Sequence, residues 1–77
     1  MKGLSKKIQK DFTRYFNDYK DDFSNVEIVG AYVQGMRPGE GALAGDLYEE
    51  AKLIRDKETM DFIDNLETLA SELRRAS

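Results

Sequence analysis

The stretch that decides the fold, residues 23–36, is FSNVEIVGAYVQGM. Its four β-branched residues favour a strand on propensity alone. A capping box argues for a helix instead, because Ser24 stands three residues before Glu27. Phe23 and Ile28 flank this start at the positions of a hydrophobic staple. We therefore predict a helix over residues 25–36.

Two further features of this stretch favour the helix. Strict alternation, which a half-buried strand requires, gives no clean polar and apolar split. A lone strand would also lack a partner for its backbone hydrogen bonds. We expect the helix to stop near Arg37, because Pro38 disfavours the helical conformation in the residue before it. On this helix the expected core face holds Val26, Ile28, Val29, Tyr32, Val33 and Met36, and the expected outer face holds Glu27, Gly30, Ala31 and Gln34.

The segment before this stretch has the most regular helical pattern of the chain. Apolar and aromatic residues recur at steps of three and four, which places them on one arc of a helix over residues 5–22. Cations occupy the opposite arc, so we expect the aromatic stripe to face the core rather than to stack on nucleic-acid bases. The stripe is Leu4, Ile8, Phe12, Tyr15, Phe16, Tyr19 and Phe23.

Two more stripes follow after the glycine-rich segment. They are out of phase with each other, so we expect a break between Asp56 and Thr59. The predicted fold is an all-α, small four-helix bundle in a single domain, residues 1–77, with helices at roughly 5–22, 25–36, 42–56 and 59–75. Because no glycine or proline marks that break, one bent helix over the last two segments stays open. The stripes are Leu43, Leu47, Ala51 and Ile54, then Ile63, Leu66, Ala70 and Leu73.

The segment between the second and third helices, QGMRPGEGALAGD at residues 34–46, holds four of the six glycines. It does not match a phosphate-binding P-loop, since the residues after Gly41 are Ala42 and Leu43 rather than lysine and a hydroxyl residue. A dinucleotide-binding loop needs strands on both sides of its helix, and we predict none. We expect a connector in which Pro38 and Gly39 form a turn. Gly41 should supply unusual backbone angles and close packing there.

The composition lacks the residue types that most often act in catalysis. Among the 77 residues there is no cysteine and no histidine, which removes thiolate and imidazole nucleophiles, bases and metal ligands. We therefore expect no enzyme activity, no metal site and no cofactor. Apolar positions near the start are interrupted by lysines, so we expect a soluble cytoplasmic protein that does not bind a membrane. Four carboxylates of the last helix should form a solvated face: Glu58, Asp61, Asp64 and Glu72.

Charge is unevenly distributed along the chain, whose net charge is −3. The first twenty residues carry six Lys or Arg against two Asp, and the rest carries six against thirteen Asp or Glu. Mutual attraction of the two parts explains this asymmetry most simply. A nucleic-acid-binding face is the alternative, and its candidate residues are Lys2, Lys6, Lys7, Lys10 and Arg14.

Leu53 and Met60 fit neither of the last two stripes. In a continuous helix they would lie on one face two turns apart, with Tyr48 or Phe62 nearby, as a contact patch for a protein. The small size and high charge also suit a stoichiometric regulator. We expect a protein-binding module without catalysis: an inhibitor, an antitoxin-like protein or an adaptor of a larger target. Self-association is a further expectation, because so small a core supplies only about 3–5 kcal/mol.

Overall fold

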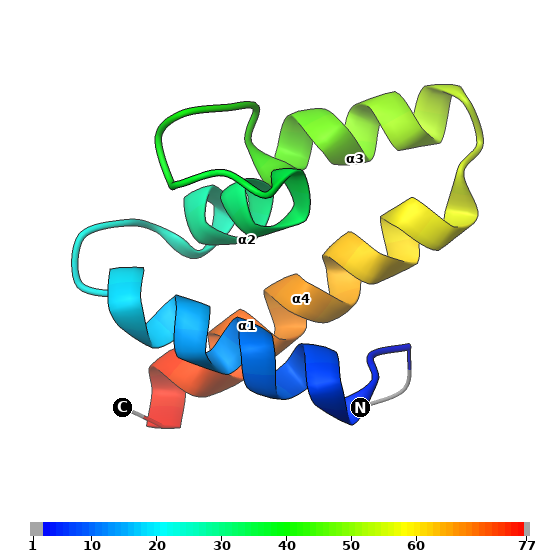
Figure 1. The fold of residues 1–77 in the computed structure, drawn as a ribbon. Coiled ribbons are helices and arrows are strands. Elements are labelled where there is room, and N and C mark those ends of the chain that lie inside the picture. Colours follow the sequence, from blue (N-terminus) through cyan, green and yellow to red (C-terminus); the bar gives the residue numbers. More distant parts are fainter. Residues whose placement is uncertain (1–2, 77) are drawn as a thin grey trace.

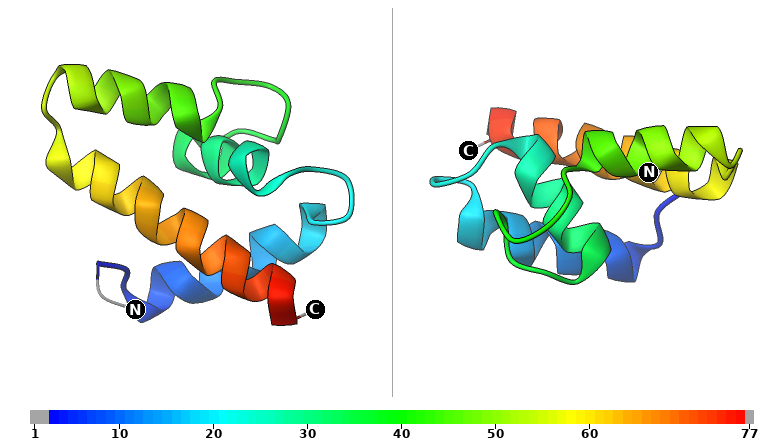
Figure 2. Two further views of the ribbon diagram at one scale, coloured as in Figure 1. Left: turned by 180° about the vertical axis from the view of Figure 1, so that it is seen from behind. Right: turned by 90° about the horizontal axis from the view of Figure 1, so that it is seen from above.

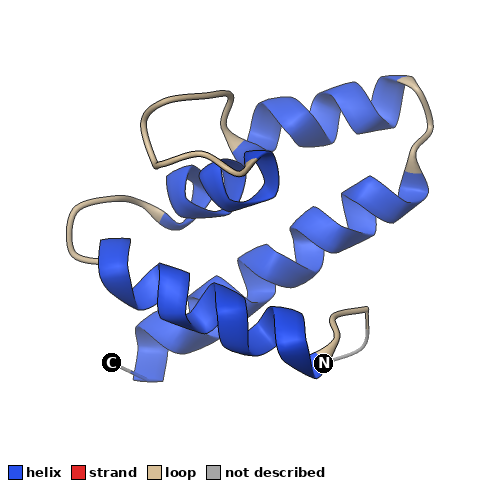
Figure 3. Ribbon diagram, viewed as in Figure 1, coloured by secondary structure: helices blue, strands red, loops and turns tan. Residues whose placement is uncertain are grey.

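The computed structural model describes residues 3–76, which form four helices joined by loops, without strands in that range (Figures 1 and 3). The predicted all-α bundle is confirmed, and its last two helices are separate. The helix ends differ from the predicted ones by a few residues. The helices are α1 at Lys6–Tyr19, α2 at Asn25–Gln34, α3 at Ala44–Leu53 and α4 at Lys57–Ala76.

Helices α2 and α4 form the centre of the bundle. Each contacts the three other helices, whereas α1 and α3 do not touch each other. Figures 1 and 2 show α1 and α3 on opposite sides, with α4 running the length of the molecule, behind α1 and below α3 in the view of Figure 1. The α3–α4 hairpin extends beyond the other two helices, and the whole measures 35 × 28 × 19 Å. One end of this hairpin is therefore exposed on several sides.

The core lies where α1, α2 and α4 meet. The aromatic stripe of α1 is buried or half-buried and its lysines are exposed, as its periodicity predicts. The stripe of α4 is confirmed in the same way. By contrast, α3 contributes only alanines to the buried set, so it is held by close approach more than by large side chains. The largest fully buried side chains are Phe12, Phe16, Ile28, Val29, Ile63 and Leu66.

Arg74 joins the end of α4 to the end of α1. Its guanidinium lies 5.2 Å from the centre of the Phe16 ring. It donates hydrogen bonds to Lys20 O at 3.0 Å and Phe23 O at 3.2 Å, and to Asn25 Oδ1 at 2.7 Å. Cations are favoured at a helix C-terminus, and here the cation of α4 meets the C-cap carbonyl of α1 and a carbonyl of the following loop.

The capping box at the start of α2 is confirmed. Glu27 N donates to the Ser24 hydroxyl at 3.3 Å, and Ser24 N donates to Glu27 Oε1 at 3.1 Å. The helix ends at Gln34 and not near Arg37. Gly35 terminates it with φ of 68°, a left-handed conformation that glycine adopts without steric cost. Pro38 therefore comes too late to decide the end of this helix.

The face of α2 that we expected to point outward is partly wrong. Gly30 and Ala31 are buried, whereas Val26 and Met36, expected in the core, are 39% and 38% exposed. A Cβ on Gly30 would lie 2.6 Å from the backbone nitrogen of Ala44, so α3 begins almost in contact with the α2 backbone. A helix packed on several sides has no single apolar face. The helical wheel of α2 therefore predicted the buried residues only in part.

The loop between α2 and α3 is a connector, as expected. Glu40 N donates to Arg37 O at 3.2 Å, and Gly39 has φ of 91°, so Pro38 and Gly39 occupy the centre of a type II turn. The unusual backbone angles belong to Gly35 and Gly39 and not to Gly41. What Gly41 provides is space, because a Cβ there would meet the side chains of Gln34 and Met36.

The break between α3 and α4 falls slightly earlier than predicted. Arg55 takes the left-handed conformation at φ 60°, and Asp56 N donates to Ala51 O at 2.7 Å. These features make a Schellman ending in which arginine replaces the usual glycine. Helix α3 therefore ends sharply although no glycine follows it.

The ends of the α3 stripe are exposed, contrary to expectation. Leu43 is 42% exposed and Ile54 is 69% exposed. Leu43 is the N-cap of α3 and Ile54 its C-cap. Both residues lie where the helix ends, so the packed face between them does not include them.

Candidate protein-binding surfaces

The turn between α3 and α4 presents two large apolar side chains to solvent. Leu53 is 84% exposed and Ile54 is 69% exposed, the two highest values among the large hydrophobic residues described. We call this pair the apolar tip. Single exposed apolar residues are ordinary, but an adjacent pair on a projecting turn costs free energy in water unless something covers it.

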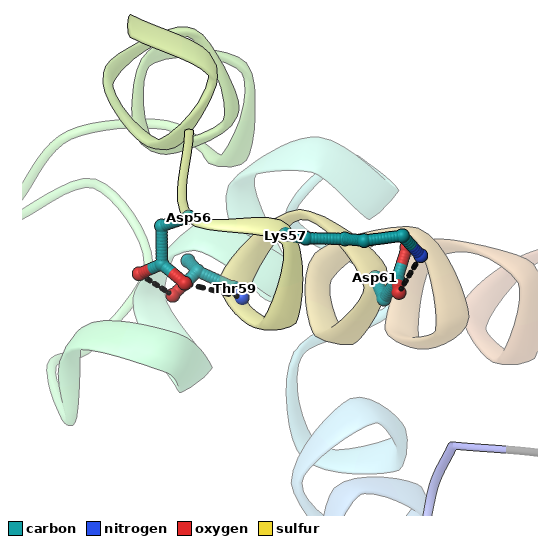
Figure 4. Close-up of polar contacts among 4 residues, drawn as sticks. All are labelled: Asp56, Lys57, Thr59 and Asp61. Carbon is teal, nitrogen blue, oxygen red and sulfur yellow. Dashed lines mark hydrogen bonds and ion pairs between the residues drawn. The ribbon is translucent and has the colours of Figure 1, made fainter. Parts of the chain in front are cut away.

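Hydrogen bonds at the start of α4 hold this tip in place (Figure 4). The backbone nitrogen of Thr59 donates to Asp56 Oδ1 at 3.2 Å, and its hydroxyl donates to Asp56 Oδ2. Both bonds lower the pKa of Asp56, the bond from the Thr59 hydroxyl more than the bond from the Thr59 backbone. Lys57 forms an ion pair with Asp61 at 2.9 Å, one turn along the helix. The apolar tip is thus carried by a capped, ordered turn.

The four predicted protein-binding residues differ in their exposure. Leu53 is exposed, as predicted, but Met60 lies on a different helix and is half-buried, so the two do not stack on a continuous helix. Tyr48 and Phe62 pack against the core as half-buried residues. The partner of Leu53 is Ile54, which sequence periodicity assigned to the core. Asp56, a favoured N-cap residue, was the signal that could have placed the turn correctly.

A second surface, which sequence reasoning missed, is an open groove of about 700 Å³ beside α1 and α2. Its apolar lining comes from Tyr15, Tyr32, Val33, Met36 and Phe62, and we call it the aromatic groove. The two tyrosine rings lie 5.2 Å apart and nearly edge to face. Tyr15, residues 32–36 and Phe62 are far apart in the sequence, so no local pattern brings these three parts together.

Polar groups fix the shape of the aromatic groove. Tyr15 donates from its hydroxyl to Met36 O at 2.7 Å, and Tyr32 donates to Asp11 Oδ2 at 2.7 Å. Burial and the bond to Asp11 raise the pKa of Tyr32 to about 12. Burial, then Tyr19 and Glu40, raise the pKa of Tyr15. Both hydroxyls therefore stay protonated at neutral pH and keep donating.

The predicted nucleic-acid face lies on α1. Lys6, Lys7, Lys10 and Arg14 are all exposed, and Lys2 lies outside the described residues. Lys10 and Arg14 also line a shallow groove between α1 and α4. The other lining residues are Gln9, Thr13 and Asn17, which contribute amide and hydroxyl groups, and Leu69 of α4.

Other kinds of site receive no support from the geometry. Over residues 3–76, no three acidic residues gather where they could hold a metal ion. In the same range, no helix has the length and apolarity to cross a membrane. Of the four carboxylates expected to form a solvated face on α4, Asp61 pairs with Lys57, and the other three are exposed to solvent: Glu58, Asp64 and Glu72. The fifth acidic residue of this helix, Glu67, is half-buried.

No protein-family model matches the chain, and no curated protein or solved structure matches it either. Any function must therefore be inferred from the surfaces themselves.

Proposed function

We propose that this chain is a small non-enzymatic protein-binding module that acts as a stoichiometric regulator of a larger protein. Such a regulator is an inhibitor, an antitoxin-like protein or an adaptor. The observation that carries the proposal is the apolar tip, where Leu53 is 84% exposed beside Ile54. In a typical interface, a few residues that become buried in the partner's pockets supply most of the binding free energy.

The way in which the tip is held supports the same proposal. A binding residue that is already in place loses little conformational entropy when its partner arrives. Arg55 ends α3 and Asp56 caps α4 on either side of the turn, so the backbone that carries Leu53 is ordered before binding. Leu53 makes little contact with its own core, which leaves it free to fill a pocket.

A photo-crosslinking residue placed at position 53 tests this function. In the native host, irradiation should join the chain to one larger protein in a one-to-one product. The same residue at position 72, where Glu72 is exposed on α4, should not. The joined protein, once purified, should bind the wild-type chain and lose affinity by about 2 kcal/mol or more for Leu53→Asp. Equal crosslinking at both positions, or equal affinity of the variant, would refute the proposal.

Nucleic-acid binding through α1 is a second candidate, because Lys10 and Arg14 line a groove together with amide side chains that can donate hydrogen bonds. Its test is a mobility-shift titration with nonspecific DNA and RNA at low salt. Binding that falls with salt and is abolished by Lys10→Glu with Arg14→Glu would favour this function over the first. No shift with the wild-type chain would eliminate it.

A further inference from the structure

The hydrogen-bonding groups around the aromatic groove are mostly acceptors. Among the described residues that line it, Asp11 and Glu40 carry carboxylates and Arg37 carries the one cation. Both tyrosine hydroxyls have already donated their hydrogens, so their oxygens can only accept further bonds. The backbone nitrogens of Gly35 and Met36 donate to carbonyls of α2. A ligand with N–H donors and a positive charge therefore suits this groove.

Neither carboxylate of the groove is paired with a described cation. No described lysine or arginine forms an ion pair with Asp11 or Glu40, and both of these residues are exposed. Tyr32 donates to Oδ2 of Asp11, which leaves Oδ1 for a ligand. Glu40 lies close enough to add, after burial and Tyr19, to the raised pKa of Tyr15. Both negative charges thus lie beside tyrosine side chains.

The charges next to the groove favour the same kind of ligand. Phe62 lines both the groove and a second hollow, whose lining includes Glu58 and Asp61. Asp61 is paired with Lys57, whereas Glu58 is exposed. On α1, Lys7 is exposed but does not line the groove, and two further cations line the separate groove between α1 and α4. Carboxylates therefore outnumber cations among the described residues of both linings.

We propose that the aromatic groove binds an arginine side chain presented by a basic segment of a partner protein. A guanidinium is planar, carries several N–H donors and stacks on aromatic rings, which matches carboxylates beside tyrosines. Val33, Met36 and Phe62 provide apolar surface for its hydrocarbon stem. This site goes beyond the proposed function, because it shares no residue with the apolar tip and takes a ligand of different chemistry.

The protein forms a contact of this kind internally. The Arg74 guanidinium lies 5.2 Å from the centre of the Phe16 ring while it donates to oxygen atoms of Lys20, Phe23 and Asn25. Lysine matches such a site less well, because its ammonium is compact, strongly hydrated and unable to donate two parallel bonds to one carboxylate. The expected ligand of the groove is therefore arginine rather than lysine.

Titration of the purified chain with an arginine peptide tests this site. The probe is a glycine peptide with one central arginine and blocked ends, and the readout is the amide spectrum of the protein by NMR. Signals of Tyr15, Val33 and Met36 should shift along one saturable curve, whereas those of Thr13 and Asn17, in the α1–α4 groove, should not. The same peptide with citrulline, which keeps the shape but lacks the charge, should bind about tenfold more weakly or worse. The lysine peptide should bind a few-fold more weakly than the arginine peptide.

Two variants assign the binding to the groove. Asp11→Asn and Glu40→Gln each remove one charge at an exposed position and should each raise the dissociation constant of the arginine peptide by about threefold or more. Glu49→Gln removes an exposed carboxylate that lines neither hollow, so it is the matched control and should leave the constant unchanged. Circular dichroism confirms that all three variants remain folded.

Three results would overturn the inference. One is the absence of a saturable shift with the arginine peptide at up to about 10 mM. Another is equal affinity for the citrulline or the lysine peptide, because the groove would then not select a guanidinium. The third is an equal loss of affinity in Glu49→Gln and Asp11→Asn, because binding would then follow net charge alone. None of these results depends on Leu53, so crosslinking from position 53 tests the proposed function independently.

Discussion

Arg55 shows at the scale of one residue how this chain makes a turn without glycine. Its φ of 60° places the Cβ close to the following carbonyl oxygen, a strained arrangement for any residue but glycine. The bond from Asp56 N to Ala51 O maintains this conformation at the end of α3. The strain lies directly beside the apolar tip.

Arg55→Gly should therefore stabilise the protein. We expect the free energy of unfolding to rise by about 0.5–1 kcal/mol, since relief of strain exceeds the extra freedom of glycine in the unfolded chain. Lys52→Gly, inside the last turn of α3, is the control and should lower the free energy of unfolding by about 1 kcal/mol. Urea denaturation of both variants checks this, and an equal loss in both would contradict it.

Gly30 is required by a close approach of backbones. A Cβ there would lie 2.6 Å from Ala44 N and 2.9 Å from Ala42 O, and backbone atoms cannot move aside cheaply. Gly30→Ala should lower the free energy of unfolding by about 1–3 kcal/mol, although alanine favours helices. At Gly45 an added Cβ would meet no atom within 4 Å, so Gly45→Ala should raise the free energy of unfolding by up to about 1 kcal/mol. Thermal unfolding of this pair separates packing from propensity.

At the scale of the helices, stability depends on how their ends are satisfied. The backbone nitrogen and hydroxyl of Ser24 lower the pKa of Glu27 below its ordinary value of 4.5. A lowered pKa means that the folded state favours the charged carboxylate. The capping box should thus contribute stability above pH 4.5 and lose it as the pH falls through the lowered value.

The free energy of unfolding of the wild type, measured from pH 6 to pH 3, should fall more steeply than that of Glu27→Gln. Glu67 provides a contrast, since burial and Asp64 raise its pKa. Its carboxylate costs stability once ionised, so Glu67→Gln should stabilise at neutral pH, with a gain that disappears in acid. Parallel pH profiles for the wild type and Glu27→Gln would contradict the first expectation.

Arg74 connects the ends of α4 and α1. Lysine cannot reproduce its planar fork, which reaches Asn25, Lys20 O and Phe23 O together. We expect Arg74→Lys to lower the free energy of unfolding by about 1–2 kcal/mol. Arg75→Lys, its exposed neighbour, should change it little. Chemical denaturation compares the two, and equal effects would show that the connection contributes nothing.

At the scale of the whole molecule, the small core limits the free energy of unfolding. Phe16 is fully buried among α1, α2 and α4, and removing such a ring costs about 3–5 kcal/mol. A core of this size rarely supplies more than about 3–5 kcal/mol in total. Phe16→Ala should therefore be largely unfolded at 25 °C by circular dichroism. Leu53→Ala, at the exposed tip, should retain full helicity, and a folded Phe16→Ala protein would show that the core is larger than estimated.

Local signals determined the helices of this protein. The period of three and four in α1 and α4 and the capping box at Ser24 each act within a few residues, so the sequence alone could predict them. The two candidate surfaces were predicted less well. Leu53 was recognised as lying outside the apolar stripes. Ile54 was assigned to a stripe, and the aromatic groove was not predicted.

Only the tertiary structure decided which faces are covered. Gly30 is buried because α3 begins against it, and Ile54 is exposed because α3 ends before Ile54 can reach a neighbour. Tyr15 and Tyr32 meet at the groove because α1 and α2 pack together. Burial depends on what lies opposite a residue in space, and that neighbour is usually distant in the chain. The sequence by itself thus determined where helices form, and packing determined what they expose.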